Sequence, residues 1–171
     1  MKRIAIIVPP GSGKSTFARE LSRIYNLPIV HLDFYYHQTG QNYQTNNEAW
    51  IVRVKQLISQ DKWIIDGNYS STLKERSERA DLVIFLDFPK RTYMSGIMKR
   101  WFEYYDKTRS DMPADWKERM NFEFVNYVWH FKSRERHKIT DKLDIYDNDK
   151  VKVLHSRKAA KVYLNTLRAN I

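Results

Sequence analysis

Short runs of apolar residues alternate with amphipathic segments along the chain. The runs are rich in β-branched side chains, which is typical of strands buried on both faces. They predict β-strands at residues 3–8, 28–33, 62–69, 81–89 and 150–155. Between the runs, apolar residues mostly recur at helical spacing. This pattern predicts a helix that ends at residue 25 and further helices at residues 46–60, 70–80, 90–106, 116–137 and 156–167, with a loop at 106–115.

Strands separated by helices predict an α/β fold, because such strands pair in parallel through right-handed crossovers. We expect one three-layer α/β/α domain over residues 1–171, since this length is enough for a compact core. In such sheets the ligand binds beyond the carboxyl ends of the strands. Candidate groups follow four of the predicted strands at that edge: the loop after Val8, Asp33, Asp66 and the loop after Leu154.

Composition narrows the classes of protein to consider. The net charge of +10 favours anionic partners such as nucleotides, nucleic acid or phosphorylated metabolites, although it is also compatible with solubility alone. Cysteine is absent, which excludes disulfides and thiolate metal sites, and the five histidines lack the spacing of a zinc site. No apolar run reaches the roughly 18 residues of a membrane span. We therefore expect a cytoplasmic protein.

The segment VPPGSGKST at residues 8–16 has the pattern of a phosphate-binding loop between a strand and a helix. Its glycines let main-chain amides approach a polyphosphate, and the start of the helix adds free N–H groups. Lys14 is placed to reach the β- and γ-phosphates of ATP, and the hydroxyl of Ser15 can bind Mg²⁺. The expected nucleotide contacts are Gly11, Ser12, Gly13, Lys14, Ser15 and Thr16. The alternative is a glycine-rich helix cap with a chance lysine.

Val8 stands where a phosphate loop normally has its first glycine. A valine costs little there if its backbone is extended, and more if its φ angle must be positive. Pro9 and Pro10 fix two φ angles and remove two amide donors, which leaves donors from Gly11 to Ser15. We therefore expect nucleotide binding to persist with some loss of affinity.

Four further segments accompany this loop: LDFYY at 32–36, DGNY at 66–69, LDFP at 86–89 and WHFKSRERHKI at 129–139. Together with the loop they resemble the DNA topology modulation protein (FlaR-related) family, small P-loop proteins that are similar to adenylate kinase. The resemblance covers nearly the whole chain. It implies a parallel sheet of strand order 2-3-1-4-5 and a helical lid inserted at about residues 100–136. The family is named after a genetic effect, so its name does not decide the chemistry.

Two acidic residues are expected near the phosphates. Asp66 precedes a glycine at the end of its strand, and the resemblance to kinases implies that it supports Mg²⁺, directly or through water. Asp33 faces the acceptor side, where it can take a proton from an acceptor hydroxyl or bind that group. A plain structural role, as a turn aspartate or a solvated strand end, is the alternative for both. Asp87 is interpreted as a turn residue.

Phosphoryl transfer depends on positioning and charge neutralisation, so arginines that close over the γ-phosphate are expected. The catalytic candidates are Arg100, Arg134 and Arg136, and Arg109 is a further nucleotide contact. Arg134 and Arg136 cannot share one face of a helix, so they lie at a helix end or only one of them reaches phosphate. The resemblance places Arg157 near adenine, where it can stack on the base. A solvated surface position is the alternative for each arginine.

These features predict an ATP- and Mg²⁺-binding phosphotransferase of the nucleoside or nucleotide kinase type, in which Asp33 engages the acceptor. For Arg76 and Arg79 a surface role is preferred to one on the acceptor side. The rival interpretation is a nucleic-acid-binding protein that keeps the P-loop fold. It rests on the basic residues Lys132, Arg134, Arg136, Lys138 and Lys142. No helix-turn-helix, ribonucleoprotein or zinc-finger motif supports it. Hydrolysis of ATP without transfer is a third interpretation.

Overall fold

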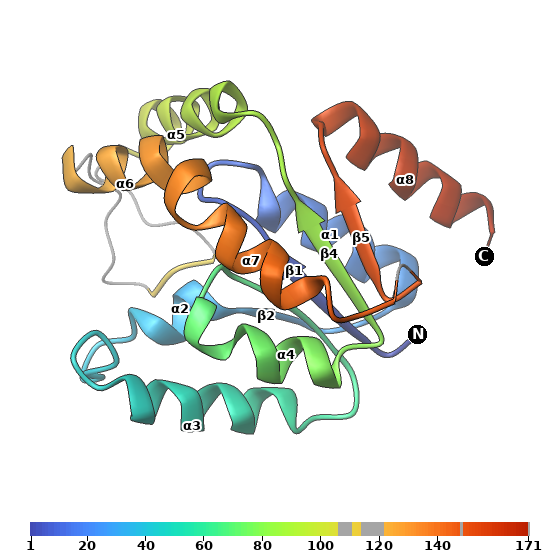
Figure 1. Ribbon diagram of the computed structural model, residues 1–171, viewed down its shortest axis with the longest axis horizontal. Coiled ribbons are helices and arrows are strands. Elements are labelled where there is room, and N and C mark those ends of the chain that lie inside the picture. Colours follow the sequence, from blue (N-terminus) through green and yellow to red (C-terminus); the bar gives the residue numbers. More distant parts are fainter. Residues whose placement is uncertain (106–110, 114–121, 148, 171) are drawn as a thin grey trace.

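The computed structural model describes residues 1–105, 111–113, 122–147 and 149–170, and within these ranges five parallel strands form one sheet (Figure 1). Their spatial order, β2-β3-β1-β4-β5, confirms the order implied by the resemblance to adenylate kinase. The strands are β1 (Arg3–Ile7), β2 (Ile29–His31), β3 (Trp63–Asp66), β4 (Leu82–Leu86) and β5 (Val151–Leu154).

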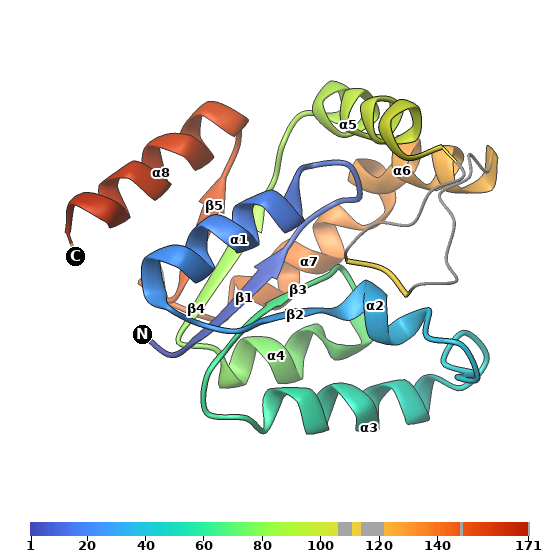
Figure 2. The same ribbon diagram turned by 180° about the vertical axis from the view of Figure 1, so that it is seen from behind.

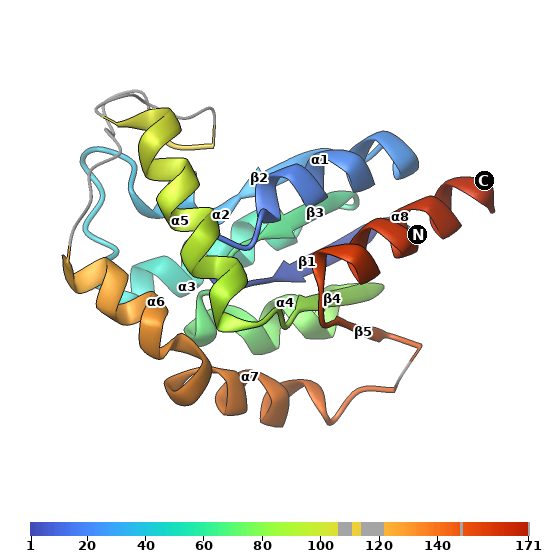
Figure 3. The same cartoon turned by 90° about the horizontal axis from the view of Figure 1, so that it is seen from above.

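Helices cover both faces of the sheet, as a three-layer fold requires. The helices are α1 (Lys14–Tyr25), α2 (Leu32–Tyr36), α3 (Asn47–Ile58), α4 (Leu73–Arg79, after a 3₁₀ turn at Ser70–Thr72), α5 (Lys90–Tyr104), α6 (Phe122–Arg134), α7 (Arg136–Leu143) and α8 (Arg157–Ala169). α1 and α8 lie against one face, and α3, α4 and α7 lie on the other (Figures 2 and 3). α5 and α6 lie beyond the carboxyl ends of the strands, on the side of the phosphate loop.

The strands supply both cores because their side chains alternate between the two faces. In β1, Ile4 and Ile6 join the core under α1 and α8, whereas Ala5 and Ile7 join the core under α4 and α7. All four side chains are shielded from solvent. Burial on both faces explains why the strands are continuous apolar runs in the sequence.

Two predicted elements are wrong in their extent. The chain leaves β2 after His31 and turns into α2, so Asp33 lies in the first turn of a short helix and not at the end of a strand. The apolar and aromatic residues at 28–36 gave no sign of this change from strand to helix. The carboxylate of Asp33 is favourable near the start of a helix because of the helix dipole. The helix predicted at 116–137 is interrupted in its described part at Glu135, where φ is −111°, and α7 then continues to Leu143.

The lid predicted at about residues 100–136 lies partly outside the described residues, which leave out 106–110 and 114–121. It therefore stays a prediction. The described limb α6 is anchored to the rest of the molecule, since Val128 and Phe131 are buried in the two cores. Within the described ranges, no helix combines the length and the apolar character needed to cross a membrane.

Candidate active site

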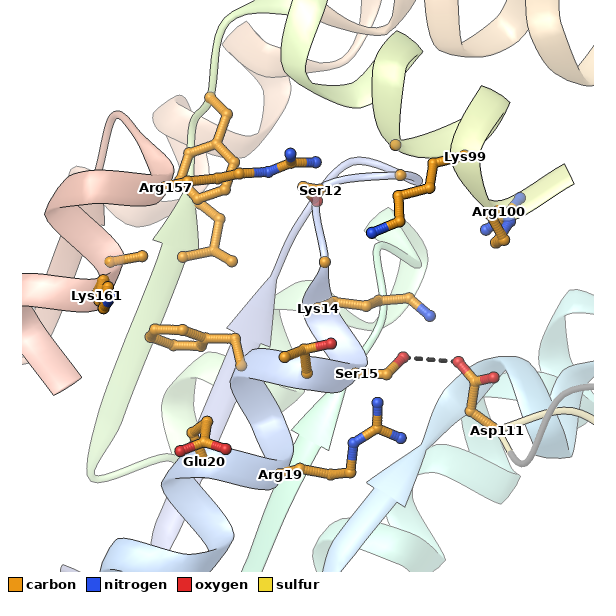
Figure 4. Close-up of a pocket in the computed structure, with 18 of the residues that line it drawn as sticks. Ser12, Lys14, Ser15, Arg19, Glu20, Lys99, Arg100, Asp111, Arg157 and Lys161 are labelled. Carbon is orange, nitrogen blue, oxygen red and sulfur yellow. Dashed lines mark hydrogen bonds between the residues drawn. The ribbon is translucent and has the colours of Figure 1, made fainter. Parts of the chain in front are cut away.

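The phosphate loop joins β1 to α1 at the carboxyl edge of the sheet (Figure 4). Gly11 and Gly13 have φ angles of 81° and 88°, in the left-handed region where other residues are strained. The Ser12 hydroxyl donates to the carbonyl of Pro9 and closes the turn. No side chain caps the start of α1, so its first N–H groups remain available at the loop. This arrangement favours a bound anion.

Val8 fits the loop without backbone strain. Among the described residues, Asn26 is the non-glycine residue with a positive φ angle, so Val8 keeps an ordinary backbone conformation. Its side chain is 1% exposed and belongs to the core under α1. The missing first glycine is therefore replaced by a core residue.

An acidic neighbour holds Lys14. The lysine ammonium donates to Asp33 Oδ2, and the hydroxyl of Tyr69 donates to Asp33 Oδ1 at 2.9 Å. Burial is the largest influence on Lys14 and opposes its charge. Nearby carboxylates, Asp33 foremost, outweigh burial and raise the pKa of Lys14 above its usual value. Lys14 is therefore a fixed positive charge at neutral pH.

Asp66 ends β3 and is fully buried. Its Oδ2 lies 2.8 Å from Nδ1 of His31, while Oδ1 has no hydrogen-bond partner within the described part of the chain. A buried carboxylate oxygen of this kind is costly unless a cation or a water satisfies it. Together with the hydroxyl of Ser15 it offers oxygen ligands of the type that Mg²⁺ accepts, so these residues fit the ion.

Asp111 reaches the same place from the segment predicted as a loop. Its Oδ2 accepts a hydrogen bond from Ser15 Oγ at 2.6 Å (Figure 4). The residue is 5% exposed, and its charge also helps to raise the pKa of Lys14. A carboxylate thus lies against the hydroxyl that is expected to bind Mg²⁺.

A cavity of about 600 Å³ opens beside the loop, between α1, α5 and α8. Figure 4 shows Lys99 of α5 pointing toward the loop, and Arg157 at the start of α8 extending over Ser12. The cavity is lined by seven basic residues and three acidic ones. The basic residues are Lys14, Arg19, Lys99, Arg100, Arg157, Lys161 and Arg168, and the acidic residues are Glu20, Glu103 and Asp111. The volume is in the range of small-ligand sites, and the excess of basic groups suits a polyphosphate.

Comparison with known proteins identifies the fold. No protein-family model matches the chain, and no curated protein matches it. A shikimate kinase from Bacteroides thetaiotaomicron matches with a TM-score of 0.63 at 14% identity, over 99% of this chain and 97% of that one. A gluconokinase from Sinorhizobium meliloti 1021 gives 0.56 at 12% identity, over 99% and 94%. A deoxyadenosine kinase from M. mycoides with bound dATP gives 0.53 at 17% identity, over 96% and 98%.

This chain has the fold of the P-loop kinases.

Within the P-loop kinase fold, two predicted arginines reach the cavity. Arg100 lines it from α5, with its guanidinium 5.4 Å from the ring of Phe124. Arg157 lines it from α8 and donates to the carbonyl of Thr92 at 3.4 Å. Arg109 lies outside the described residues, so its predicted contact with the nucleotide stays a prediction.

The other two predicted arginines lie elsewhere in the P-loop kinase fold. Arg134 is exposed at the end of α6. Arg136 pairs through its Nε and Nη2 with the carboxylate of Asp87, at 2.9–3.0 Å. Asp87 is 5% exposed and also lies 3.4 Å from Nδ1 of His155. Asp87 is therefore the buried partner that ties the start of α7 to the end of β4, a role that its interpretation as a turn residue missed.

The surface role preferred for Arg76 is wrong. Arg76 is fully buried and donates to the carbonyls of Gly67, Tyr69 and Thr72, at 2.8–3.2 Å. Burial lowers its pKa to about 10. Arg79 likewise donates to main-chain carbonyls, at the end of α3. Both arginines of α4 thus bind main chain, and Arg76 fixes the loop that follows β3.

Several residues of the site were not found from the sequence. Lys161 lies one helical turn after Arg157 on α8, so helical spacing offered a signal for it. Lys99 is adjacent to Arg100 on α5, and adjacent helical residues do not share a face, so spacing offered no such signal for Lys99. Tyr69 lies in the DGNY segment, but nothing local indicates its bond to Asp33.

Proposed function

We propose that this chain is an ATP- and Mg²⁺-dependent phosphotransferase that moves the γ-phosphate of ATP to a small acceptor, as nucleoside and nucleotide kinases do. The observation that carries the proposal is the position of Lys14. It starts α1 beside a basic cavity of about 600 Å³ and touches Asp33. A lysine between a phosphate site and a carboxylate can contact both the phosphoryl donor, ATP, and the group that binds the phosphoryl acceptor.

The chain's own groups would bind the nucleotide as follows. The uncapped main-chain amides at the start of α1 would bind the phosphates, and Lys14 would neutralise their charge. Arg100 and Lys99 line the cavity from α5 and Arg157 lines it from α8, where the resemblance to kinases implies that it would stack on the base. Ser15 and Asp66 would hold Mg²⁺, which supplies charge neutralisation when it is bound.

In the transfer step, the oxygen of an acceptor hydroxyl forms a bond to the γ-phosphorus. The bond from that phosphorus to the bridging oxygen breaks, and its electron pair leaves with ADP. The hydroxyl proton passes to Asp33 Oδ2, the oxygen that holds Lys14 in the structure, while Tyr69 keeps Oδ1 in place. Positioning by these groups supplies most of the expected acceleration.

The similar solved structures support phosphoryl transfer. One is a shikimate kinase that was solved with shikimate, and another is a deoxyadenosine kinase with bound dATP. Kinases for unlike acceptors thus share this fold. The relation to the DNA topology modulation protein family stays a prediction.

Calorimetry with ATP, with and without Mg²⁺, tests the proposal. We expect binding that Mg²⁺ strengthens, and a loss of affinity of at least about tenfold in Lys14→Met, because one charge-assisted contact is worth about 1.5–3 kcal/mol. Lys158→Met, an exposed change on α8, serves as the control. Absence of ATP binding in the presence of Mg²⁺ would contradict the proposal. Detection of ADP without a phosphorylated product, across a broad acceptor panel, would favour hydrolysis.

Nucleic-acid binding remains the second candidate, because Lys132 and Arg134 are exposed on α6. Other members of the basic stretch are engaged within the molecule: Arg136 with Asp87, Lys138 with Glu135, and Lys142 with the carbonyl of Ser70. A gel-shift assay at about 50 and 200 mM salt measures this activity, which should fall steeply with salt. Binding at about 50 mM salt that falls steeply at about 200 mM, together with no ATP turnover, would favour the second candidate.

A further inference from the structure

Polar groups from three elements meet on the acceptor side of Lys14. We call this set the acceptor cluster: Asp33 of α2, Asn68 and Tyr69 of the loop after β3, and Tyr127 of α6. Tyr69 donates to Asp33 Oδ1 at 2.9 Å, and Asn68 Nδ2 donates to the hydroxyl of Tyr127 at 3.4 Å. The DGNY segment thus connects the carboxylate that touches Lys14 to the helix α6.

The acceptor cluster is open to a ligand. The side chain of Asp33 is 25% exposed and that of Tyr127 is 40% exposed. Burial raises the pKa of Tyr127, and the charge of Asp33 adds to this effect. Tyr127 therefore keeps its proton at neutral pH, and Asp33 is close enough to interact with it electrostatically. The 3.4 Å contact to Asn68 is long, so both groups can turn to a ligand at little cost.

Four cationic side chains of α3, α4 and α7 are engaged in other contacts, whereas Lys132 and Arg134 of α6 are exposed. From α4, Arg76 and Arg79 bind main-chain carbonyls. From α3, the guanidinium of Arg53 lies 5.0 Å from the centre of the Tyr35 ring, and Lys142 of α7 donates to the carbonyl of Ser70. Within the described residues, α3, α4 and α7 offer no arginine fork to an anionic acceptor. The nearby carboxylates of Asp33 and Asp66 would also repel one.

We infer that the acceptor is an uncharged hydroxyl compound, a nucleoside or a polyol, bound by Asn68 and Tyr127 with its reactive hydroxyl at Asp33. This inference rests on the proposed function and narrows it. Phosphorylated or carboxylated acceptors are disfavoured because a buried or half-buried anion needs a matching cation. Neutral hydroxyls need only the donors and acceptors that the acceptor cluster presents.

Calorimetry on the full chain, saturated with a non-hydrolysable ATP analogue and Mg²⁺, tests the inference. The panel pairs nucleosides with their monophosphates, and neutral polyols with the corresponding acids and phosphates. We expect at least one neutral member to bind at least about tenfold more tightly than its anionic partner. The inference is overturned if the anionic partners bind more tightly than the neutral compounds. It is also overturned if the ATP analogue binds but no neutral compound of the panel does. Failure of the analogue itself to bind contradicts the proposed function instead.

Variants of the acceptor cluster give a second readout. We expect Tyr127→Phe and Asn68→Ala each to weaken acceptor binding by about three- to tenfold, the loss of one hydrogen bond, with the affinity for the ATP analogue unchanged. Tyr146→Phe is the matched control, because this hydroxyl lies beyond α7 and has no hydrogen-bond partner in the described residues. Unchanged acceptor affinity in both variants would show that the acceptor binds elsewhere.

Discussion

Asp33 holds two donors at once, and this decides what a ligand must displace. Its Oδ2 accepts from Lys14 and its Oδ1 from Tyr69. A triphosphate that reaches Lys14 competes with a carboxylate for the same ammonium, and it also approaches the charge of that carboxylate. Lys14, Asp33 and Tyr69 therefore already have partners that the reaction would change.

Replacement of Asp33 separates binding from transfer. We expect Asp33→Asn to bind ATP about three- to tenfold more tightly, because one negative charge near the triphosphate is removed. Phosphoryl transfer should fall by about 10²–10⁴, since the proton acceptor is lost. Calorimetry and product formation measure the two effects. Asp61→Asn, at an exposed position, is the control, and weaker ATP binding in Asp33→Asn would contradict this account.

Because its backbone is unstrained, we expect Val8 to contribute to stability and to leave the affinity for ATP nearly unchanged, in contrast to the loss of affinity expected from the sequence. We expect Val8→Gly to lower the free energy of unfolding by about 2–4 kcal/mol, because a buried side chain is lost and the unfolded chain gains freedom. ATP affinity should stay within about twofold of the original, since the main-chain donors follow this position. Urea unfolding and calorimetry provide the measurements. A large change in affinity at constant stability would mean that the turn depends on this side chain.

At the scale of elements, α5 touches the phosphate loop through two glycines. A Cβ atom on Gly96 would overlap the carbonyl oxygen of Gly11, and it would lie 3.3 Å from Nη2 of Arg157. A Cβ on Gly11 would in turn overlap the carbonyl of Tyr93. The loop and α5 are therefore packed main chain to main chain, and the side chain of Arg157 from the start of α8 lies against the same contact.

An alanine at position 96 tests this packing by the sign of its effect. In an open helix, glycine to alanine stabilises by about 0.5–1 kcal/mol. We expect Gly96→Ala instead to destabilise the protein and to weaken ATP binding at least about fivefold, because the main chain of Gly11 must move. Ser95→Ala, exposed on the same helix, is the control. A gain in stability at Gly96→Ala would show that the two elements can separate freely.

For the whole molecule, the sequence predicted those features of the fold that depend on the pattern of residues within one segment. The five strands and the phosphate loop follow from short segments, and the order of the strands followed from the resemblance. Contacts between distant positions could not be predicted. Ser15 and Asp111 are 96 positions apart, and Asp87 and Arg136 are 49 apart. The spacing of apolar residues along the chain does not indicate such pairs, because they form only when the helices and the sheet pack together.

Another distant contact contributes to the stability of the molecule against acid. Asp81, before β4, accepts from the main-chain N–H groups of Lys2 and Arg3 at 2.7 and 3.0 Å, and from the Arg3 guanidinium. Partial burial opposes the charge of Asp81, but these bonds outweigh it and lower its pKa below the usual 3.8. A lowered pKa in the folded state means stability that is present above the ordinary value and is lost as the pH falls through the folded value.

We expect Asp81→Asn to unfold more easily than the parent protein near neutral pH, by about 1–2 kcal/mol. The difference should shrink as the pH falls from 3.8 through the lowered pKa of the folded state, because the parent aspartate then loses its charge. Urea unfolding across this range measures it, with Asp61→Asn as the exposed control. A difference that does not change with pH would show that the aspartate acts by packing alone.

The hydrogen bond between Ser15 and Asp111 has a kinetic consequence. Because a carboxylate accepts a hydrogen bond from the serine in the free protein, binding of the proposed nucleotide would be an exchange of one anion for another. Two-step exchange has a signature: the observed rate rises with nucleotide concentration and then reaches a plateau at the rate at which the carboxylate departs. The free protein would in this way set its own upper speed for loading, however much nucleotide surrounds it.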